Sequence, residues 1–316
     1  SAYSLPGVSS DQKEIVLGAK VTAMQSAGQS LRVLVGDVEG RVTVWQLDSL
    51  KKSAGPFEIM MPVMSLAWNA TEESIAAGGQ DGAIRIWNLS TGKEREMLKQ
   101  LDSQVTALVF TSNGKSLIAG TQHGLYWFDS DTGKIQKSRL DIKDTSCLAI
   151  SLDGKHLLQG SYSNSAQILD LATGKRRGAV LQDRRSITHV AFSKDSGTAV
   201  TAGENQSVLL WDVMTGESRG ESLNHPKRVV GLRVNTNGWV QSASEMSIAP
   251  RWQIPRIADV NSERLKIWLE TLTTMEVTKE GLIQQLSHDQ WQKRSQRLHQ
   301  LGGPPDLFPA SSSQSK

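Results

Sequence analysis

Short segments of alternating apolar and polar residues, separated by turn-forming residues, recur along most of this chain. The clearest example starts with a turn at Asp81, continues as the alternating segment 84–89 around Trp87, and ends in a second turn at Thr91 and Gly92. Alternation with a period of two, bounded by turn residues, is typical of a half-buried β-strand. The pattern therefore predicts a chain built mainly of short β-strands.

The pattern repeats with a period of 41 or 42 residues. One marker begins an apolar strand in six copies, at Val21, Val63, Val105, Ser146, Ile187 and Val229. A second marker, a large apolar residue, keeps the same spacing at Trp45, Trp87, Phe128, Leu169, Trp211 and Trp252. In the second copy the pattern predicts strands over residues 63–68, 74–79, 84–89 and 95–98. Four short strands per period of this length indicate the blade of a β-propeller.

The apolar positions of the repeat also predict how the blades are held together. A four-stranded sheet with two apolar faces cannot bury both by itself, whereas radial stacking buries each face against a neighbouring sheet. Trp87, in the third strand of its copy, is therefore interpreted as a packing residue between blades rather than as part of a binding site.

The repeats resemble those of the WD-repeat family of β-propellers. The stretch 81–88 and the Trp211-Asp212 dipeptide match the closing strand of the family repeat, and the segments 112–115 and 152–155 match its hairpin turn. The resemblance covers residues 21 to 255, approximately, and implies an all-β WD-repeat β-propeller with six recognisable blades.

One polar feature of that family is incomplete in this sequence. In its best-formed repeats, a histidine before the first strand binds an aspartate in the turn before the third strand. Here His225 and Asp81 belong to different copies, and no copy holds both partners. We therefore expect each blade to be held by packing rather than by this network.

The two ends of the repeat region predict how the ring closes. The third strand of the sixth copy, expected over 250–254, is followed by Pro255 and a helical pattern, so its fourth strand is missing. Residues 14–17 have the alternation of an outer strand. We predict a leader over 1–13 and a propeller over 14–256, closed by this amino-terminal strand. A seventh blade would need roughly 40 further residues of repeat, which are not visible in the sequence.

The residues after the propeller predict a small helical extension over 257–303. Apolar residues from Leu265 to Met275 fall on one face of a first helix. Residues 277–286 suggest a hairpin, and Ser287 with Gln290 forms a capping-box pattern that opens a basic helix. A disordered tail is expected over residues 304–316.

The extension is similar to the carboxyl-terminal extension of WD-repeat proteins in planctomycete-like bacteria. The chain thus resembles the carboxyl-terminal WD-repeat region of planctomycete-type bacterial serine/threonine protein kinases. The segments that carry this resemblance are 265–273, 281–286, 291–298 and 301–304. In those proteins the propeller often follows a kinase domain in the same polypeptide. The resemblance implies a docking or regulatory module of a larger bacterial signalling protein.

Composition narrows the classes of partner and compartment. The chain has 35 Lys and Arg against 32 Asp and Glu, a formal net charge of +3, which by itself indicates neither nucleic acid nor anionic lipid as a partner. Cys147 is the sole cysteine, so no intramolecular disulfide can form, and a cytoplasmic location is expected. No apolar run approaches the roughly 20 residues that a membrane helix needs.

Candidate chemistry is sparse. The segment 113–116 mimics the end of a phosphate-binding loop, but Val109 stands where the motif requires its first glycine. Kinase signatures are absent, and the six histidines lack metal-ligating spacing, so no metal and no cofactor are expected. His189, in an inner strand, is interpreted as structural. The sequence predicts a protein that is not an enzyme.

Charged residues in the loops that enter the first strands give the one candidate binding surface. These loops lie together on one face of a propeller. The third and fourth copies supply acidic residues at Asp102, Asp141 and Asp144, interrupted by Lys143. The fifth and sixth copies supply basic residues at Arg184, Arg185, Lys227 and Arg228, opposed by Asp183.

Ordinary solvated loops would account for these charges. The functional interpretation is a docking face for a protein or peptide partner that is acidic or phosphorylated, because arginine clusters give charge-assisted contacts to such groups. The sequence favours a non-catalytic protein-protein interaction scaffold. A nucleic-acid-binding propeller and an enzyme with a site at the channel mouth are the alternatives.

Overall fold

The computed structural model describes residues 17–27, 31–69, 71, 73–95, 100–235, 238–245, 251–254, 262–277 and 283–301. The chain divides into two compact units, Ser1–Gln253 and Ile254–Lys316. None of the described helices is long and apolar enough to cross a membrane.

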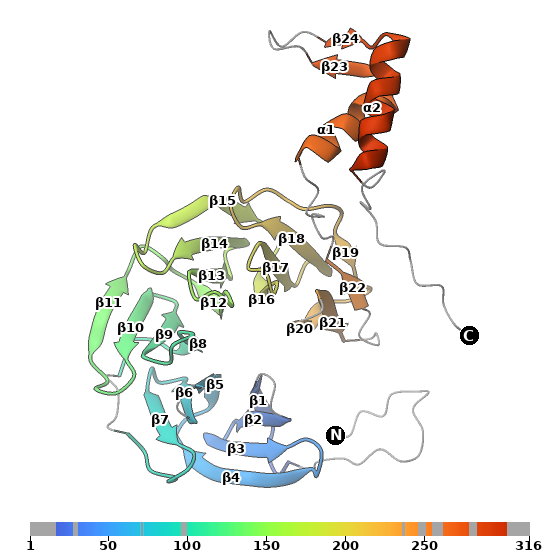
Figure 1. Ribbon diagram of the computed structural model, residues 1–316. Helices are drawn as coiled ribbons and strands as arrows, with labels where there is room; N and C mark the ends of the chain where they lie inside the picture. Colours follow the sequence, from blue (N-terminus) through green and yellow to red (C-terminus); the bar gives the residue numbers. More distant parts are fainter. Residues whose placement is uncertain are drawn as a thin grey trace. The chain divides into compact units, whose positions relative to one another are not determined.

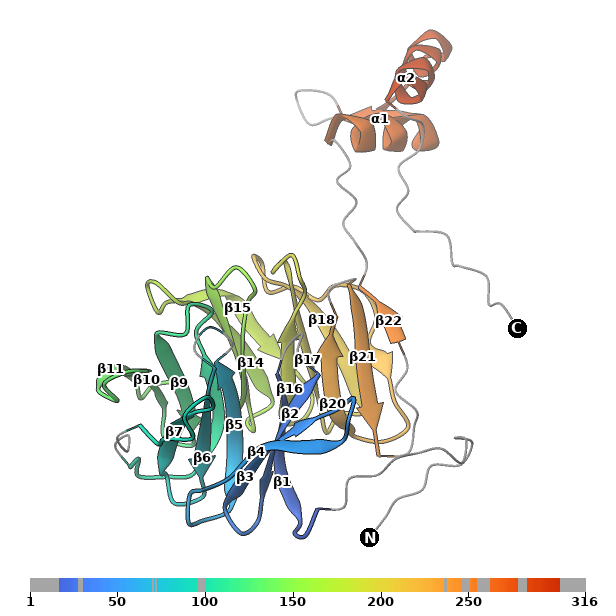
Figure 2. The ribbon, with the colours of Figure 1, turned by 60° about the horizontal axis from the view of Figure 1, so that its bottom comes forward.

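Six antiparallel sheets follow one another around the first unit, as Figure 1 shows from the end of the channel and Figure 2 from the side. Blade 1 holds β1 (Val21–Ser26), β2 (Arg32–Asp37), β3 (Arg41–Gln46) and β4 (Lys51–Glu58), and blade 2 holds β5 (Val63–Asn69), β6 (Ser74–Gly79) and β7 (Ile84–Asn88). Blade 3 holds β8 (Val105–Phe110), β9 (Ser116–Thr121), β10 (Leu125–Asp129) and β11 (Ile135–Arg139).

Blade 4 holds β12 (Thr145–Ile150), β13 (His156–Ser161), β14 (Ser165–Asp170) and β15 (Arg176–Gln182). Blade 5 holds β16 (Ile187–Phe192), β17 (Thr198–Gly203), β18 (Ser207–Asp212) and β19 (Leu223–Asn224), and blade 6 holds β20 (Val229–Val234), β21 (Trp239–Ser244) and β22 (Arg251–Gln253). In each sheet, strands that are consecutive in the chain are neighbours. The all-β propeller fold predicted from the repeat is confirmed.

The strands predicted in the second copy match the structure closely. Strands β5, β6 and β7 cover the predicted segments 63–68, 74–79 and 84–89 to within one residue at each end. Of the predicted fourth strand, the described part is a bridge between Trp87 and Glu94 and the hydrogen bond from Arg95 N to Ile86 O. Residues 96–99 lie outside the described residues.

The six blades share one hydrogen-bonding register. In every blade the innermost strand is antiparallel to the second strand and carries a bulge after its first paired residue. The first pairs are Val21–Asp37, Val63–Gly79, Val105–Thr121, Thr145–Ser161, Ile187–Gly203 and Val229–Ser244. Because a bulge fixes which side chains point to each face, residues at matched positions can be compared across blades.

Packing between sheets holds neighbouring blades together. The ring of Trp87 is 3% exposed and lies 5.4 Å, centroid to centroid, from the ring of Phe57 in blade 1. The same cluster joins Leu34 and Val44 of blade 1 to Ile75 of blade 2. The predicted role of Trp87 as a packing residue between blades is confirmed.

Side-chain hydroxyls add hydrogen bonds between blades near the channel. Ser65 Oγ donates to Val105 O at 2.7 Å, and Thr106 Oγ1 donates to Thr145 O at 2.5 Å. Ser146 Oγ donates to Ile187 O in the same way. Each bond satisfies a carbonyl on the first residue of the next innermost strand, so the blades are tied by polar as well as apolar contacts.

The expectation that packing alone holds every blade is wrong for blades 5 and 6. In blade 6, the His225 ring shares a 2.7 Å hydrogen bond with Ser242 Oγ, which also accepts one from Trp252 Nε1 at 3.2 Å. In blade 5, Asp183 occupies the position of that histidine and accepts a hydrogen bond from Asn205 in the turn before β18. Blade 5 therefore keeps a polar link between these two positions, with aspartate in place of histidine and asparagine in place of aspartate. A search of the sequence for a histidine and aspartate pair does not find it.

The predicted closure of the ring is not tested by the described residues. Of residues 14–17, only Leu17 is described, and it is not in a strand. The innermost strands pack side by side from β1 through β5, β8, β12 and β16 to β20, while β20 and β1 are not packed in this way. No described strand lies between blade 6 and blade 1 in Figure 1. Closure by residues 14–17 stays a prediction.

The second unit contains α1 (Ser262–Thr273), β23 (Met275–Val277), β24 (Ile283–Gln285) and α2 (His288–Gln300). The predicted capping box is present, because Ser287 Oγ accepts from Gln290 N while Gln290 Oε1 accepts from Ser287 N. Arg294 Nε on α2 donates to Glu270 Oε2 on α1 at 2.6 Å. The small helical extension is confirmed, and the domain limits stay predictions. The predicted leader over 1–13 and tail over 304–316 lie outside the described residues.

We predict that Trp87→Ala lowers the free energy of unfolding by about 3–5 kcal/mol, because it removes a buried aromatic ring and leaves a cavity between blades 1 and 2. Urea denaturation followed by circular dichroism measures the change. Leu47→Ala, at an exposed position of blade 1, is the control. A loss below ~1 kcal/mol for Trp87→Ala would contradict the packing role.

Candidate functional site

The loops that enter the innermost strands lie on one face of the propeller. Strands β12, β16 and β20 pack side by side, and all three run in the same direction because each begins its blade in the same way (Figure 2). Their amino-terminal ends therefore meet at one face. Strand β8 packs beside β12 in the same way, so the predicted acidic and basic residues lie at this face, in the loops 101–104, 141–144, 183–186 and 225–228.

The loop before β16 holds two arginines on an anchored backbone. Asp183 N donates to Asn164 O at 2.8 Å, and Asp183 Oδ1 accepts from Arg184 N at 2.6 Å and from Asn205 Nδ2 at 2.5 Å. Asp183 is 7% exposed, whereas Arg184 and Arg185 are exposed. Within the described part of the chain, neither guanidinium has an ion-pair partner.

Burial raises the pKa of Asp183, although hydrogen bonds from the backbone of Arg184 and Arg185 and from Asn205, together with the charge of Arg184, oppose the shift. Its Oδ2 is buried and has no hydrogen-bond partner among the described groups. The carboxylate therefore supports the loop from inside, through its hydrogen bonds to the Arg184 backbone and to Asn205, and it also attracts the nearby charge of Arg184.

The loop before β20 contributes less free charge than the sequence predicts. Arg228 Nε lies 2.7 Å from Glu245 Oε1, in a pair with both side chains substantially exposed. Such pairs contribute little to stability, but this one neutralises the Arg228 charge locally. Lys227 is exposed and makes no ion pair with a described residue. The structure thus leaves Arg184, Arg185 and Lys227 as the available cations.

The acidic residues of the fourth copy contact neighbouring residues of the protein. Arg139 Nε and Nη2 lie 2.8 and 2.7 Å from the two carboxylate oxygens of Asp141, and this contact lowers the pKa of Asp141 to about 2. Asp144 Oδ2 accepts from Ser163 Oγ at 2.8 Å. Asp102 is exposed. The basic loops are therefore more available to a partner than the acidic ones.

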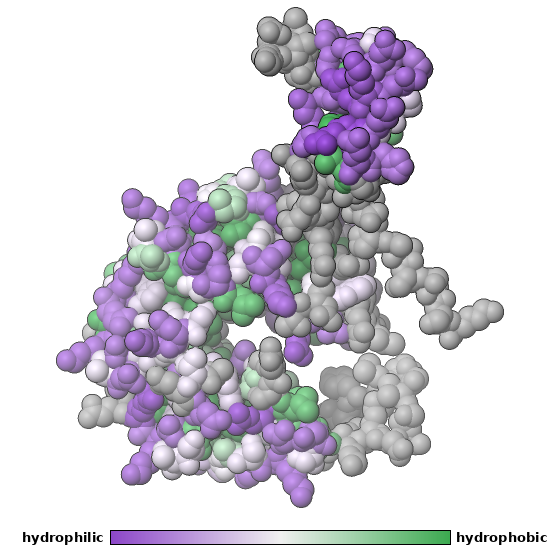
Figure 3. Space-filling view, viewed as in Figure 1, coloured by the Kyte–Doolittle hydropathy of each residue, from purple (hydrophilic) through white to green (hydrophobic). Residues whose placement is uncertain are grey.

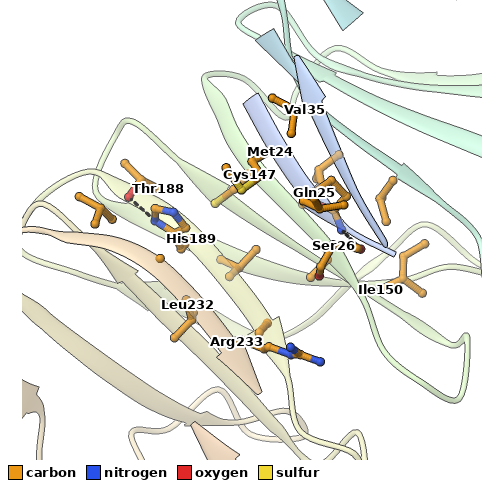
Figure 4. Close-up of a pocket in the computed structure, with 18 of the residues that line it drawn as sticks. Met24, Gln25, Ser26, Val35, Cys147, Ile150, Thr188, His189, Leu232 and Arg233 are labelled. Atoms are coloured by element: carbon orange, nitrogen blue, oxygen red, sulfur yellow. Dashed lines mark hydrogen bonds between the residues drawn. The ribbon is translucent and has the colours of Figure 1, made fainter. Parts of the chain in front are cut away.

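A central cavity of about 980 Å³ is lined by the innermost strands of blades 3 to 6 and by residues of blade 1. Figure 4 shows Cys147 and His189 on this wall, with the hydrogen bond of 2.9 Å between His189 Nδ1 and Thr188 Oγ1. Burial raises the pKa of the Cys147 thiol to about 12 and lowers the pKa of His189.

These two groups do not form a nucleophile and base pair. No hydrogen bond joins Cys147 to His189, and a thiol with so high a pKa carries almost no thiolate at neutral pH. Across the described residues, no cluster of three or more His, Cys, Asp or Glu side chains could hold a metal ion. The channel alternative for an enzyme therefore has no reactive constellation to support it in this part of the chain.

Two residues at the candidate surface were missed by sequence reasoning. Asn205 holds Asp183, and Glu245 pairs with Arg228. Asn205 could have been found from the repeat, because it stands at the position that Asp81 occupies in blade 2. Glu245 gave a weaker signal, since its pairing depends on the path of the turn after β21.

Two models of protein families match parts of this chain. The model of the anaphase-promoting complex subunit 4 WD40 domain matches residues 41–113, and that of the WD domain, G-beta repeat, matches residues 178–212. Among curated proteins, the chain is similar to protein tipD of Dictyostelium discoideum, with 25% identity over 103 residues. That match covers 32% of this chain and only 17% of tipD.

Solved structures share the fold at low sequence identity. A chain in the crystal structure of the mitotic checkpoint complex matches with a TM-score of 0.68 and 17% identity, covering 76% of each chain. The computationally designed Ika8 protein matches with a TM-score of 0.63 and 21% identity, covering 74% of this chain and 71% of its own. This chain therefore carries WD-repeat segments and folds as a WD-repeat β-propeller.

Proposed function

We propose that this protein is a non-catalytic scaffold that binds a protein or peptide partner through the loops entering its innermost strands. WD-repeat propellers generally act as protein-interaction scaffolds, and the fold displays many loops on a rigid framework. The lack of a hydrogen bond between Cys147 and His189 on the wall of the central cavity supports the non-catalytic assignment.

The basic loops are the proposed contact site for an acidic or phosphorylated segment of the partner. The observation that carries this proposal is the exposure of Arg184 and Arg185, neither of which forms an ion pair with a described residue, on a backbone fixed by buried Asp183. A guanidinium donates two parallel hydrogen bonds to a phosphate or carboxylate. Because the loop is already ordered, binding loses little backbone entropy.

The nucleic-acid alternative has less support. Glu204 and Glu245 lie on the same face as the four basic residues, and Glu245 already pairs with Arg228. The overall charge of +3 is small for a chain of this length. A surface with so few free cations would give the weak phosphate attraction expected of an ordinary protein surface.

The wider context of the scaffold rests on the resemblance of the carboxyl-terminal extension. We propose that the propeller is a docking or regulatory module of a larger bacterial signalling protein, with a kinase domain in the same polypeptide. A cytoplasmic location is part of this proposal, in keeping with the free thiol of Cys147.

Charge reversal at the two arginines tests the binding proposal. Binding of a library of phosphoserine and phosphothreonine peptides, with unphosphorylated counterparts, is measured for the natural chain and for the Arg184→Glu, Arg185→Glu variant. A hydrogen bond to a charged group contributes about 1.5–3 kcal/mol, so affinity for the selected peptides is expected to fall at least ~100-fold.

The control variant carries the same charge change elsewhere on the propeller. Lys155→Glu with Lys194→Glu alters exposed residues in the turns at the other ends of β12 and β16 and is expected to bind normally. Equal affinities for the arginine variant and the natural chain, or equal losses in the two variants, would rule out the proposed site.

A second prediction concerns the support beneath the loop. Because burial raises the pKa of Asp183 in the folded state, its ionised form opposes folding at pH 7, and the penalty disappears below the ordinary aspartate pKa. Asp183→Asn keeps an oxygen acceptor for Arg184 N. We expect it to be more stable than the natural chain at pH 7, with the difference shrinking as the pH falls toward 3.

Urea denaturation across this pH range measures the difference in unfolding free energy between Asp183→Asn and the natural chain. A variant that is less stable at pH 7 would show that the Asp183 carboxylate stabilises the loop through its charge.

A further inference from the structure

A small cavity of about 200 Å³ lies at the end of the propeller opposite the candidate docking loops. Its walls include Ile150, Phe192 and Val234, which are the last residues of β12, β16 and β20. The basic loops 183–186 and 225–228 precede the first residues of β16 and β20, at the other ends of the same strands. The cavity is therefore separate from the docking face described above.

The cavity has apolar walls that water reaches. Ile150, Phe192 and Val234 are each only half-buried. Leu152, in the turn after β12, lines the same cavity and is 67% exposed. Hydrophilic residues, purple in Figure 3, predominate on the described surface of the propeller in that view. An exposed leucine beside three half-buried apolar residues departs from this pattern, and covering them would remove apolar surface from water.

The turns that form the rim of the cavity are ordered. Asp153 N, in the turn after β12, donates to Ser196 Oγ in the turn after β16 at 3.3 Å. Within each turn an aspartate Oδ1 accepts a hydrogen bond from a serine hydroxyl, from Ser151 to Asp153 at 2.6 Å and from Ser193 to Asp195 at 2.5 Å. Because the walls are already in place, binding at this cavity loses little backbone entropy.

The charged residues that line this part of the propeller are cations. Lys194 lines the cavity, is exposed, and forms no ion pair with a described residue. The central cavity, which shares Ile150 and Phe192 with the smaller one, is lined by Arg233. Neither cavity has an aspartate or glutamate among its lining residues. A carboxylate next to an apolar group would therefore complement the site in charge as well as in polarity.

The size of the cavity indicates what enters it. A volume of about 200 Å³ is below the range of about 300–1,000 Å³ that holds cofactors and comparable ligands. It is close to that of an engineered cavity of ~150 Å³ that binds benzene. The cavity therefore fits one large apolar side chain of a polypeptide better than a complete small-molecule ligand.

We propose that this cavity binds a segment of a protein partner in which a large apolar side chain lies next to an aspartate or glutamate. The apolar side chain enters beside Phe192 and Leu152, and the neighbouring carboxylate meets the ammonium group of Lys194. This site does not depend on the function proposed for Arg184 and Arg185. Since the two sites lie at opposite ends of the strands, one partner can occupy each at the same time.

A charge exchange between protein and peptide tests the role of Lys194. Short unphosphorylated synthetic peptides carry one phenylalanine between aspartates, or between lysines in a matched set, and binding is measured by fluorescence anisotropy. Lys194→Glu is expected to lower affinity for the aspartate peptides at least ~10-fold and to raise affinity for the lysine peptides. Lys134→Glu, at an exposed position that lines neither cavity, is expected to leave both affinities unchanged.

Removal of the exposed leucine tests the apolar part of the site. Leu152→Ser is expected to lower affinity for the aspartate peptides at least ~5-fold, because less apolar surface is buried. Leu140→Ser, which changes an exposed leucine of blade 3 that lines neither cavity, is the matched control. Replacing the phenylalanine of the peptide by serine is expected to abolish binding to the natural chain.

The outcomes separate this site from the basic loops. The Arg184→Glu, Arg185→Glu variant is expected to bind the aspartate peptides as the natural chain does. Loss of binding in that variant, with Lys194→Glu unaffected, would overturn the proposal and assign the peptides to the basic loops. Absence of binding to the natural chain, or equal losses in Lys194→Glu and Lys134→Glu, would also overturn it.

Discussion

Burial of both faces of each sheet against its neighbours is the constraint on which this propeller depends. A blade such as β5 to β7 has apolar residues on both sides, and neither side is covered by strands of its own blade. The hydrophobic core of the propeller therefore consists of these interfaces, one between each pair of neighbouring blades, and not of a single cluster at the centre. Hydroxyl groups such as those of Ser65 and Thr106 fix the spacing of the innermost strands, because each must reach a carbonyl of the next blade.

The same constraint separates the residues available for binding from those used by the fold. Residues with apparent chemical interest in the sequence, such as Trp87, Cys147 and His189, are occupied by packing or by the channel wall. The loops entering the innermost strands are not needed for packing between blades. Their backbones are held by hydrogen bonds to neighbouring turns. Arg184 and Arg185 have both an ordered backbone and an exposed side chain. Asp183 fixes the loop from inside, and the two guanidinium groups stay exposed.

The sequence predicted the sheets well because the period of alternation is local. The turn at Asp81 and the spacing of Val63 and Val105 suffice to locate the strands of blade 2. Pairings between loops of different strands, such as that of Glu245 with Arg228, were harder to predict. They depend on the backbone conformation of each turn, which sets the direction of the side chains. Closure was the hardest, since it depends on which faces meet, and residues 14–16 lie outside the described part of the chain.

Closure and binding are coupled by the place of blade 6 in the array. A blade at the end of a repeat array is stabilised by one interface instead of two, so it opens more readily than an inner blade. Lys227 and Arg228 belong to the loop that enters this blade, whereas Arg184 and Arg185 belong to its inner neighbour. A partner that contacts both loops binds only when blade 6 is packed against blade 5. Any group that covers the face of blade 6 turned away from blade 5 stabilises the same packed state, so by thermodynamic linkage it strengthens binding of that partner.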